Sequence, residues 1–212
     1  GYPEGAGAVL LVEVNGLTEA VEEEATEGEA VCRQYRPLEI RTATNAAERE
    51  RLWAGRKGVL GALGRLAPNY YLVDGTIPRT KLVEVLTRIR DISKESGFPI
   101  ANLLHAGDGN LHPLLVFDPR EPGVMDRVAA AGEEIVRISL AAGGVLSGEH
   151  GIGLEKRRFM PMLFTPDDLA AQLRLRRAFD TQGLANPLKI LPTSASCGDV
   201  MGLGTVPEGV WT

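Results

Sequence analysis

Two strand-like runs separated by a glycine-rich turn place the strongest constraint on how this chain folds. Residues 100–104 and 111–117 are largely apolar, and Gly107-Asp108-Gly109-Asn110 lies between them. Glycine supplies the positive φ angles that a tight turn needs, and Asp or Asn side chains bond back to their own backbone. The segment therefore predicts a β-hairpin with its turn at 107–110.

The register of that hairpin decides whether two histidines meet. The chain contains three His, and all of them lie in two Gly-rich segments. With the turn at 107–110, Ala106 faces Leu111 and His105 faces His112, with Cβ atoms about 4.5–5.5 Å apart on one face. Two imidazoles placed in this way can bind one divalent ion. The alternative is that both are ordinary hairpin residues, at the surface or in the core.

The second Gly-rich segment, residues 148–153, contains Glu149 and His150. Glu149 can complete a His/His/Glu set, an arrangement typical of catalytic divalent sites that keep one position open for substrate. If the segment is extended, His150 points elsewhere and can act as a general base. The alternative is a glycine-rich helix entry, in which Glu149 interacts favourably with the helix dipole.

Arg56 stands out because it falls on an apolar stripe. Asn45 is expected to cap a helix that ends near Leu63. The apolar residues of this helix share one face at 3.6-residue spacing: Leu52, Val59, Leu60 and Leu63. A guanidinium on that face needs a partner, and its planar fork suits a carboxylate. Arg56 is therefore either a ligand for a substrate carboxylate, or a structural residue that snorkels or forms an internal ion pair.

The remaining segments alternate between the periods of strands and helices. Strands are predicted at 8–14, 38–44 and 70–73, besides those of the hairpin, and helices at 18–33, 45–63, 78–96 and 124–142, with another beginning at Thr165. Hairpin-joined strands alternating with helices predict an α+β fold, with a largely antiparallel sheet covered by helices. The expected domain spans residues 1–182, followed by an extended tail at 183–212 that is rich in Gly, Pro and Ser.

Composition narrows the class of protein. With 23 basic and 28 acidic residues, the net charge of −5 disfavours nucleic acids and anionic membranes as partners. The apolar run at 8–12 is too short to span a bilayer, and no charged segment precedes it, so neither an anchor nor a signal peptide is expected. Cys32 and Cys197 are isolated and are expected to be reduced thiols, which favours a cytoplasmic location.

Two further features of the sequence concern what the chain lacks. No GxGxxG follows the first strand and no P-loop is present, so the chain is expected to carry no nucleotide-binding site of its own. The chain begins at Gly1 without an initiator Met. We therefore expect it to be a fragment of something longer.

Five segments together resemble one family. They are HAGDGNLHP (105–113), SGEHGIGLEKR (147–157), GLANPLKILP (183–192), LWAGR (52–56) and DGTIP (74–78). They resemble the C-terminal half of the FAD-linked oxidases, which include D-lactate dehydrogenase, D-2-hydroxyglutarate dehydrogenase and, with the strongest likeness, the flavin subunit of glycolate oxidase. The resemblance implies a ferredoxin-like cap domain of the vanillyl-alcohol-oxidase type of flavoprotein.

The resemblance also implies roles for individual residues. His105, His112 and Glu149 would bind a divalent metal, zinc or manganese. His150 would contact the substrate and act as the catalytic base, and Arg56 would bind the substrate carboxylate. Asn186 would lie close to the FAD. In the implied mechanism, His150 takes the hydroxyl proton of a 2-hydroxycarboxylate while hydride passes from its C2 to the flavin.

The sequence departs from the family in two respects. Positions that hold a second carboxylate in the hydroxyglutarate enzymes carry Leu60, Leu72 and Leu114 here, which implies a small monocarboxylate such as glycolate or lactate. The family's FAD-binding domain is absent, so the chain alone is expected to be inactive, with its tail free of the surface on which it would pack.

The missing FAD-binding domain bears on the partners we expect and on the alternative functions. The expected partners are a small 2-hydroxycarboxylate and an FAD-binding domain or subunit, with a homodimer and attachment to the inner membrane through partner subunits as further options. One alternative function is a non-catalytic ligand- or metal-binding module derived from this family. Another is a metallohydrolase, because a His/His/Glu set with a nearby base also suits hydrolysis.

Overall fold

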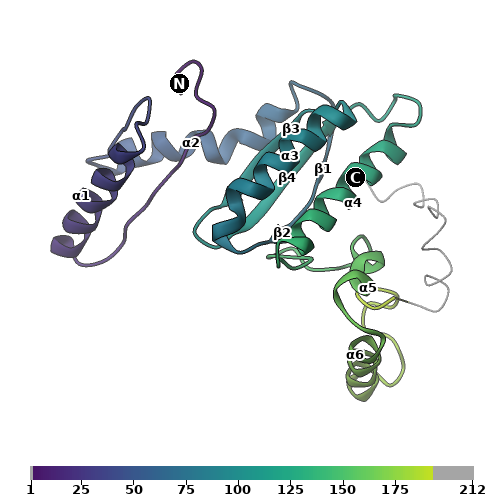
Figure 1. Cartoon of the computed structure of the whole chain (residues 1–212). Helices are drawn as coiled ribbons and strands as arrows, with labels where there is room; N and C mark the ends of the chain where they lie inside the picture. The colour runs from purple at the N-terminus through teal and green to yellow at the C-terminus, as the bar shows by residue number, and fades with distance from the viewer. Residues whose placement is uncertain (1, 193–212) are drawn as a thin grey trace. The chain divides into compact units, whose positions relative to one another are not determined.

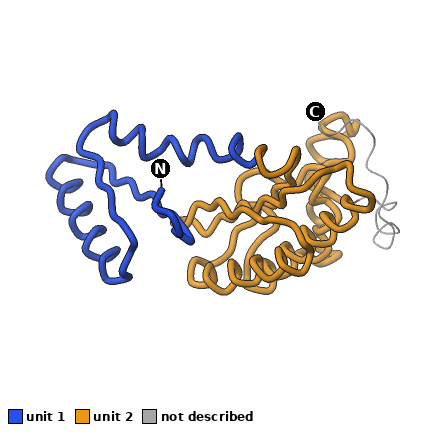
Figure 2. Tube along the Cα trace, turned by 90° about the horizontal axis from the view of Figure 1, so that it is seen from above, with its two compact units in different colours: residues 1–63 blue, residues 64–212 orange. Residues whose placement is uncertain are grey.

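The computed structural model describes residues 2–192 and divides into two compact units, residues 1–63 and residues 64–212 (Figure 2). Cys197 and the expected tail beyond residue 192 lie outside the described residues. The expected domain boundary at residue 182 stays a prediction.

The first unit contains two helices, α1 (Thr18–Gln34) and α2 (Ala46–Leu63). The start of α2 is capped as the sequence predicts, because the Asn45 side chain accepts a hydrogen bond from the Glu48 amide at 3.0 Å. Glu48 in turn accepts from the Thr44 amide at 2.8 Å. Such reciprocal bonds satisfy amides that have no partner within the helix.

The strands predicted at 8–14 and 38–44 are wrong. The structure forms no strand in either range, and apolar side chains there are exposed, among them Leu10 at 65% and Leu38 at 72%. A strand needs a neighbour that pairs with its backbone N–H and C=O groups. In the described part of the chain, no segment pairs with these two. Their β-branched composition shows only that they suit a sheet.

The second unit is built on a four-stranded antiparallel sheet (Figure 1). Its strands are β1 (Asn69–Leu72), β2 (Gly75–Thr76), β3 (Ile100–His105) and β4 (Asn110–Phe117). Strand β4 is central, because β3 pairs along one edge and β1 and β2 pair along the other. Every residue of β4 is buried, so the strand that contains His112 is also the most enclosed one.

Two helices cover one face of this sheet. A short 3-10 turn, η1 (Arg79–Lys81), leads into α3 (Leu82–Ser96), and α4 (Val124–Ala141) lies beside α3 (Figure 1). Val85, Ile89 and Ile92 form one apolar face of α3 and are buried in the core. Leu111, Leu115 and Phe117 of β4 belong to the same core.

The order of elements in the second unit is similar to that of a split β-α-β-β-α-β fold, with β1 and β2 in the place of the first strand and an isolated bridge at Val145 in the place of the last. After α4, Gly143 adopts a left-handed φ of +85°, and the Gly144 amide bonds back to the Ser139 carbonyl at 2.9 Å. This helix ending reverses the chain. Val145 then forms an isolated antiparallel bridge with Thr76 of β2. The predicted α+β class with an antiparallel sheet is confirmed.

The last described elements are η2 (Arg157–Phe159), α5 (Met160–Leu163) and α6 (Pro166–Phe179). Helix α6 begins as predicted, with a capping box between Thr165 and Asp168. Among the described residues, no helix is long and apolar enough to cross a membrane.

The described part of the tail, residues 183–192, is held more firmly than the sequence predicts. Arg157 donates a hydrogen bond to the Leu188 carbonyl at 2.6 Å, and Arg176 donates to the Asn186 carbonyl at 2.8 Å. The Ile190 amide donates to the Gly153 carbonyl at 2.8 Å. Guanidinium groups satisfy the carbonyls of an irregular segment without needing a second domain.

The core of the second unit can be tested on α3. Ile89 is fully buried, whereas Val83 on the same helix is 78% exposed. We expect Ile89→Ala to lower the free energy of unfolding by about 2–5 kcal/mol, because it removes buried methyl groups and leaves a cavity. Val83→Ala, the matched control, should stay within about 0.5 kcal/mol. Urea denaturation measures both changes, and equal effects would contradict this core.

Candidate functional site

The hairpin forms, but its register differs from the predicted one. His105 pairs with Asn110 and Leu103 pairs with His112, so the turn comprises residues 106–109. Asn110 cannot belong to the turn because it also pairs with Thr76 of β2. His105 and His112 are therefore diagonal rather than direct neighbours. Because they are still on one face of the sheet, their side chains remain within reach of each other.

The three predicted metal ligands converge. Glu149 Oε1 lies 3.1 Å from His112 Nε2 and 3.9 Å from His105 Nε2. One possible ligand atom from each of the three residues lies within 4.8 Å of the others. The two imidazole rings are nearly perpendicular, with centroids 5.5 Å apart. A hairpin and a loop about 40 residues later in the sequence thus supply a His/His/Glu cluster.

His150 belongs to the same cluster. Its ring stacks on His112 with centroids 5.0 Å apart and planes 12° from parallel, and its Nε2 lies 3.5 Å from Glu149 Oε1. His150 is expected to point elsewhere only if its segment is extended; residues 148–150 bend instead, and the His150 side chain lies beside the other three. The helix-entry alternative is not observed either, since the next helical segment is η2 at Arg157.

The cluster is buried on the His112 side and open elsewhere. The His112 side chain is 7% exposed, whereas His105, Glu149 and His150 are each about half exposed. Burial lowers the pKa of His112 and outweighs the carboxylates of Glu149 and Asp74, which act to raise it. Its ring is therefore neutral at neutral pH, which is the form that binds a metal.

One nitrogen in the cluster has no partner. Within the described residues, His112 Nε2 is buried and makes no hydrogen bond of acceptable geometry, although Glu149 Oε1 lies at 3.1 Å. An unpartnered buried polar atom is costly unless a ligand, water or ion completes its contacts. Since an imidazole nitrogen beside a carboxylate oxygen suits a divalent cation, this donor set fits the metal that the sequence predicts.

Asp74 is a site residue that sequence reasoning missed. Leu72 pairs with Leu114 and Gly75 pairs with Leu111, so the unbroken register places Asp74 opposite His112. Asp74 Oδ1 lies 3.5 Å from His112 Nε2. Sequence reasoning included Asp74 only as the first residue of the DGTIP segment and gave it no role of its own. The available signal was an acidic residue directly after a buried apolar run.

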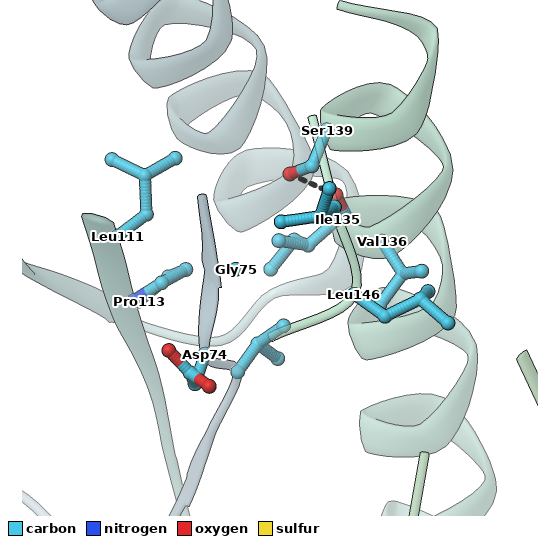
Figure 3. Close-up of a pocket in the computed structure, with 10 residues that line it drawn as sticks. Asp74, Gly75, Leu111, Pro113, Ile135, Val136, Ser139 and Leu146 are labelled. Atoms are coloured by element: carbon cyan, nitrogen blue, oxygen red, sulfur yellow. Dashed lines mark hydrogen bonds between the residues drawn. The ribbon is translucent and has the colours of Figure 1, made fainter. Parts of the chain in front are cut away.

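The environment of Asp74 is enclosed. Its side chain is 1% exposed and borders a pocket whose other walls include Leu111, Ile135 and Val136 (Figure 3). Burial acts to raise the pKa of Asp74, but hydrogen bonds from Ser147 and Lys156 outweigh it and hold that pKa well below its usual range. Asp74 is therefore a buried anion at neutral pH.

Arg56 and Asn186 are not part of this cluster as described. Arg56 belongs to α2 in the first unit and is half-buried, like Leu52 and Val59 of its predicted stripe. No ion pair of Arg56 is found among residues 2–192, which gives no support to the internal ion-pair alternative. Asn186 is exposed in the tail, with a φ of +46°. Their contacts with substrate and flavin stay predictions.

Comparison with known proteins gives one family. Residues 1–190 match the family model described as FAD linked oxidases, C-terminal domain. The chain is 42% identical over 199 residues to the glycolate oxidase subunit GlcD of Escherichia coli K12, a match that covers 94% of this chain and 40% of that protein.

Two other relatives support the same assignment. The GlcD subunit of Bacillus subtilis is 36% identical, over 92% of this chain and 42% of that protein. A probable mitochondrial D-lactate dehydrogenase of Danio rerio is 32% identical, over 86% of this chain and 37% of that protein. The chain thus spans about two fifths of the length of these relatives.

Gly148 gives a direct test of how tightly the loop packs. A Cβ added there would lie 2.2 Å from Asn110 Oδ1 and 2.6 Å from Thr76 Oγ1. We expect Gly148→Ala to displace the loop and destabilise the second unit by about 1–3 kcal/mol. Gly107→Ala is the control, because a Cβ at Gly107 meets open space and needs no positive φ. Urea denaturation would contradict the packing if both variants behaved alike.

Proposed function

This chain belongs to the C-terminal domain family of FAD-linked oxidases, and on that basis we propose that it is the substrate- and metal-binding part of a flavin-dependent 2-hydroxyacid dehydrogenase. Its reaction would convert a small 2-hydroxy acid into the 2-oxo acid. Relatives named as glycolate oxidase subunits and D-lactate dehydrogenases support this reaction class. A flavin-binding domain or subunit would be the necessary partner.

The observation that carries the proposal is the convergence of His105, His112 and Glu149 on the open side of the hairpin, with His150 stacked beside them. Two imidazoles and one carboxylate are suitable ligands for zinc or manganese, and they leave coordination positions for a substrate. The unpartnered nitrogen of His112 would gain its missing contact from such an ion.

The chemistry can be divided among the residues. When bound, the FAD would accept hydride from substrate C2 and the metal would act as a Lewis acid on the substrate hydroxyl. His150 would take the hydroxyl proton on a ring nitrogen, and its ring stacks on that of His112. Arg56 would bind the substrate carboxylate through its planar guanidinium. Asn186 is proposed to lie close to the flavin.

The side chains beside Asp74 and His112 on the sheet support a small monocarboxylate as substrate. Leu72 and Leu114 are direct cross-strand partners, two residues along from Asp74 and His112 and on the same face of the sheet. Neither leucine can bind a second carboxylate. Leu60, the third position at which the hydroxyglutarate enzymes have polar residues, is an exposed leucine of α2. Glycolate or D-lactate fits these side chains better than a dicarboxylate.

The metal site is tested on the chain as it stands. We expect one Zn²⁺ or Mn²⁺ ion to bind per chain, because three ligand atoms already lie close together. His105→Ala, His112→Ala and Glu149→Gln should each weaken binding by about 100-fold or more, since loss of even a supporting residue costs about 10–100-fold. Isothermal titration calorimetry measures the affinities.

Asp108→Asn is the control for these variants. Asp108 lies in the hairpin turn, is exposed, and is not one of the three clustered residues. Its substitution should leave the affinity for Zn²⁺ or Mn²⁺ unchanged. Parent-like affinity in all three ligand variants would contradict the metal site.

The role of Arg56 is tested in the full-length enzyme that includes the flavin domain. We expect Arg56→Lys to lower kcat/KM for glycolate or D-lactate by about 100-fold, because lysine keeps the charge but loses the two-pronged geometry. Flavin absorbance should stay normal. Arg51→Lys, on the exposed side of the same helix, is the matched control and should keep full activity. An unchanged rate with Arg56→Lys would show that Arg56 is structural only.

The same enzyme distinguishes the alternatives. A non-catalytic module would bind a metal or 2-hydroxy acid without turnover when the flavin domain is present. A metallohydrolase has no use for a flavin, and the relatives named above are all oxidoreductases. Reduction of an artificial electron acceptor by glycolate or D-lactate would favour the dehydrogenase over both.

A further inference from the structure

The loop that carries Glu149 and His150 is wrapped around a single side chain. The Asp74 carboxylate accepts hydrogen bonds from the Gly148 amide at 3.0 Å and the His150 amide at 3.1 Å, with the Glu149 amide at 3.3 Å. Successive amides that point at one anion form a nest, which is a preferred setting for negative charge. The backbone on both sides of Glu149 is thereby fixed to the end of a sheet strand.

A hydroxyl extends this arrangement. Ser147 donates to Asp74 Oδ2 at 2.6 Å, and the same Ser147 oxygen accepts from the Gly151 amide at 2.7 Å. The turn is therefore closed on both flanks, from Ser147 to Gly151. Because nothing in this set of bonds involves the side chains of Glu149 or His150, both remain available to a ligand.

Lys156 supplies the opposite charge. Its side chain is 5% exposed, and its Nζ donates to the Asp74 carbonyl at 2.6 Å and to Oδ2 at 3.0 Å. A buried carboxylate is stable only where a partner and hydrogen bonds replace its hydration. Lys156 meets that need from three residues beyond the Gly-rich segment, so the stretch 147–157 supplies both the amides and the counter-charge.

Asp74 is not itself placed as a metal ligand. Its two oxygens already accept from the amides, Ser147 and Lys156, and it does not belong to the cluster of converging ligand atoms. It nevertheless lies opposite His112, with 3.5 Å between Asp74 Oδ1 and His112 Nε2. One buried anion thus contacts both the strand that presents His112 and the loop that presents Glu149.

We propose that Asp74, with Lys156 as its counter-ion, is the positioning residue of this site: it sets the distance between Glu149 and the two histidines, and with it the metal affinity. The consequence for turnover rests on the proposed function, because positioning matters to catalysis only if the metal and His150 act there. The positioning itself can be measured without a flavin and without turnover.

The experiment compares the parent chain with Asp74→Asn. Hydrogen exchange, followed by NMR, reports whether the amides of residues 148–150 are hydrogen-bonded, and calorimetry reports the affinity for Zn²⁺. We expect protection of these amides to fall at least 10-fold, and the Kd for Zn²⁺ to rise by about 10–100-fold, as for other residues that orient metal ligands. Asp118→Asn is the matched control and should change neither, because Asp118 follows β4, is partly exposed and pairs with Arg120.

A second variant separates the proposed positioning role of Asp74 from a general loss of folding. Asp74→Asn leaves Lys156 buried without an anion, so Asp74→Asn combined with Lys156→Met removes both charges and keeps the interior neutral. This double variant should keep the circular dichroism of the parent chain and still lose the protection and the Zn²⁺ affinity. If it loses thermal stability while protection and affinity stay at parent values, Asp74 is structural only and the inference is wrong.

The two proposals fail in different ways. A parent chain that binds no Zn²⁺ overturns the metal site, and exchange at residues 148–150 then decides alone whether Asp74 orders the loop. A parent chain that binds Zn²⁺ equally well before and after Asp74→Asn, with protected amides in both, overturns the role of Asp74 and leaves the metal site intact.

Discussion

The buried ion pair between Asp74 and Lys156 is the interaction on which the rest of the site depends. It joins the link between β1 and β2 to a segment some 80 residues later, and the same carboxylate accepts hydrogen bonds from the amides on either side of Glu149. Breaking a buried pair by removing one partner typically costs about 3–5 kcal/mol, because the other charge is left uncompensated. Because burying two charges costs hydration, such a pair adds little net stability to the fold, and its main effect is to favour one conformation of the groups around it. Here that arrangement is the one in which the side chains of His105, His112 and Glu149 converge.

The two faces of strand β4 have different roles: one packs into the core and the other presents His112. Alternate residues of a strand point to opposite faces. Leu111, Leu115 and Phe117 therefore pack under α3 and α4, while His112 lies on the other face with Leu114. Because both faces are buried along β4, any shift of register by one residue would place an imidazole in the apolar core. The core thus fixes the side on which His112 is presented, and the hairpin places His105 on the same side.

The turn of the hairpin shows why the register could not be predicted from residue types alone. Gly107, Asp108, Gly109 and Asn110 all suit a turn, and the sequence alone favoured a turn made of those four. Asn110 nevertheless joins the ladder, because β2 offers it a partner on one side and β3 on the other. The same dependence on partners explains residues 8–14 and 38–44, whose composition suits strands but which find no neighbour in the described part of the chain. Pairing is a property of two segments, and neither segment encodes it alone.

The sequence by itself predicted the helices with clear caps and stripes, the α+β class, the hairpin, and the four residues of the cluster, His105, His112, Glu149 and His150. These follow from local periodicity, from turn chemistry and from motifs that lie within short segments. Only the tertiary structure decided the register, the stacking of His150 on His112, and the place of Asp74 and Lys156 beneath the loop. Those facts depend on contacts between residues as many as 82 positions apart. The sequence around an acidic residue that follows a strand is the same whether its side chain only ends the strand or binds the backbone of a distant loop. The two cases differ in tertiary structure, where Asp74 is buried against Lys156.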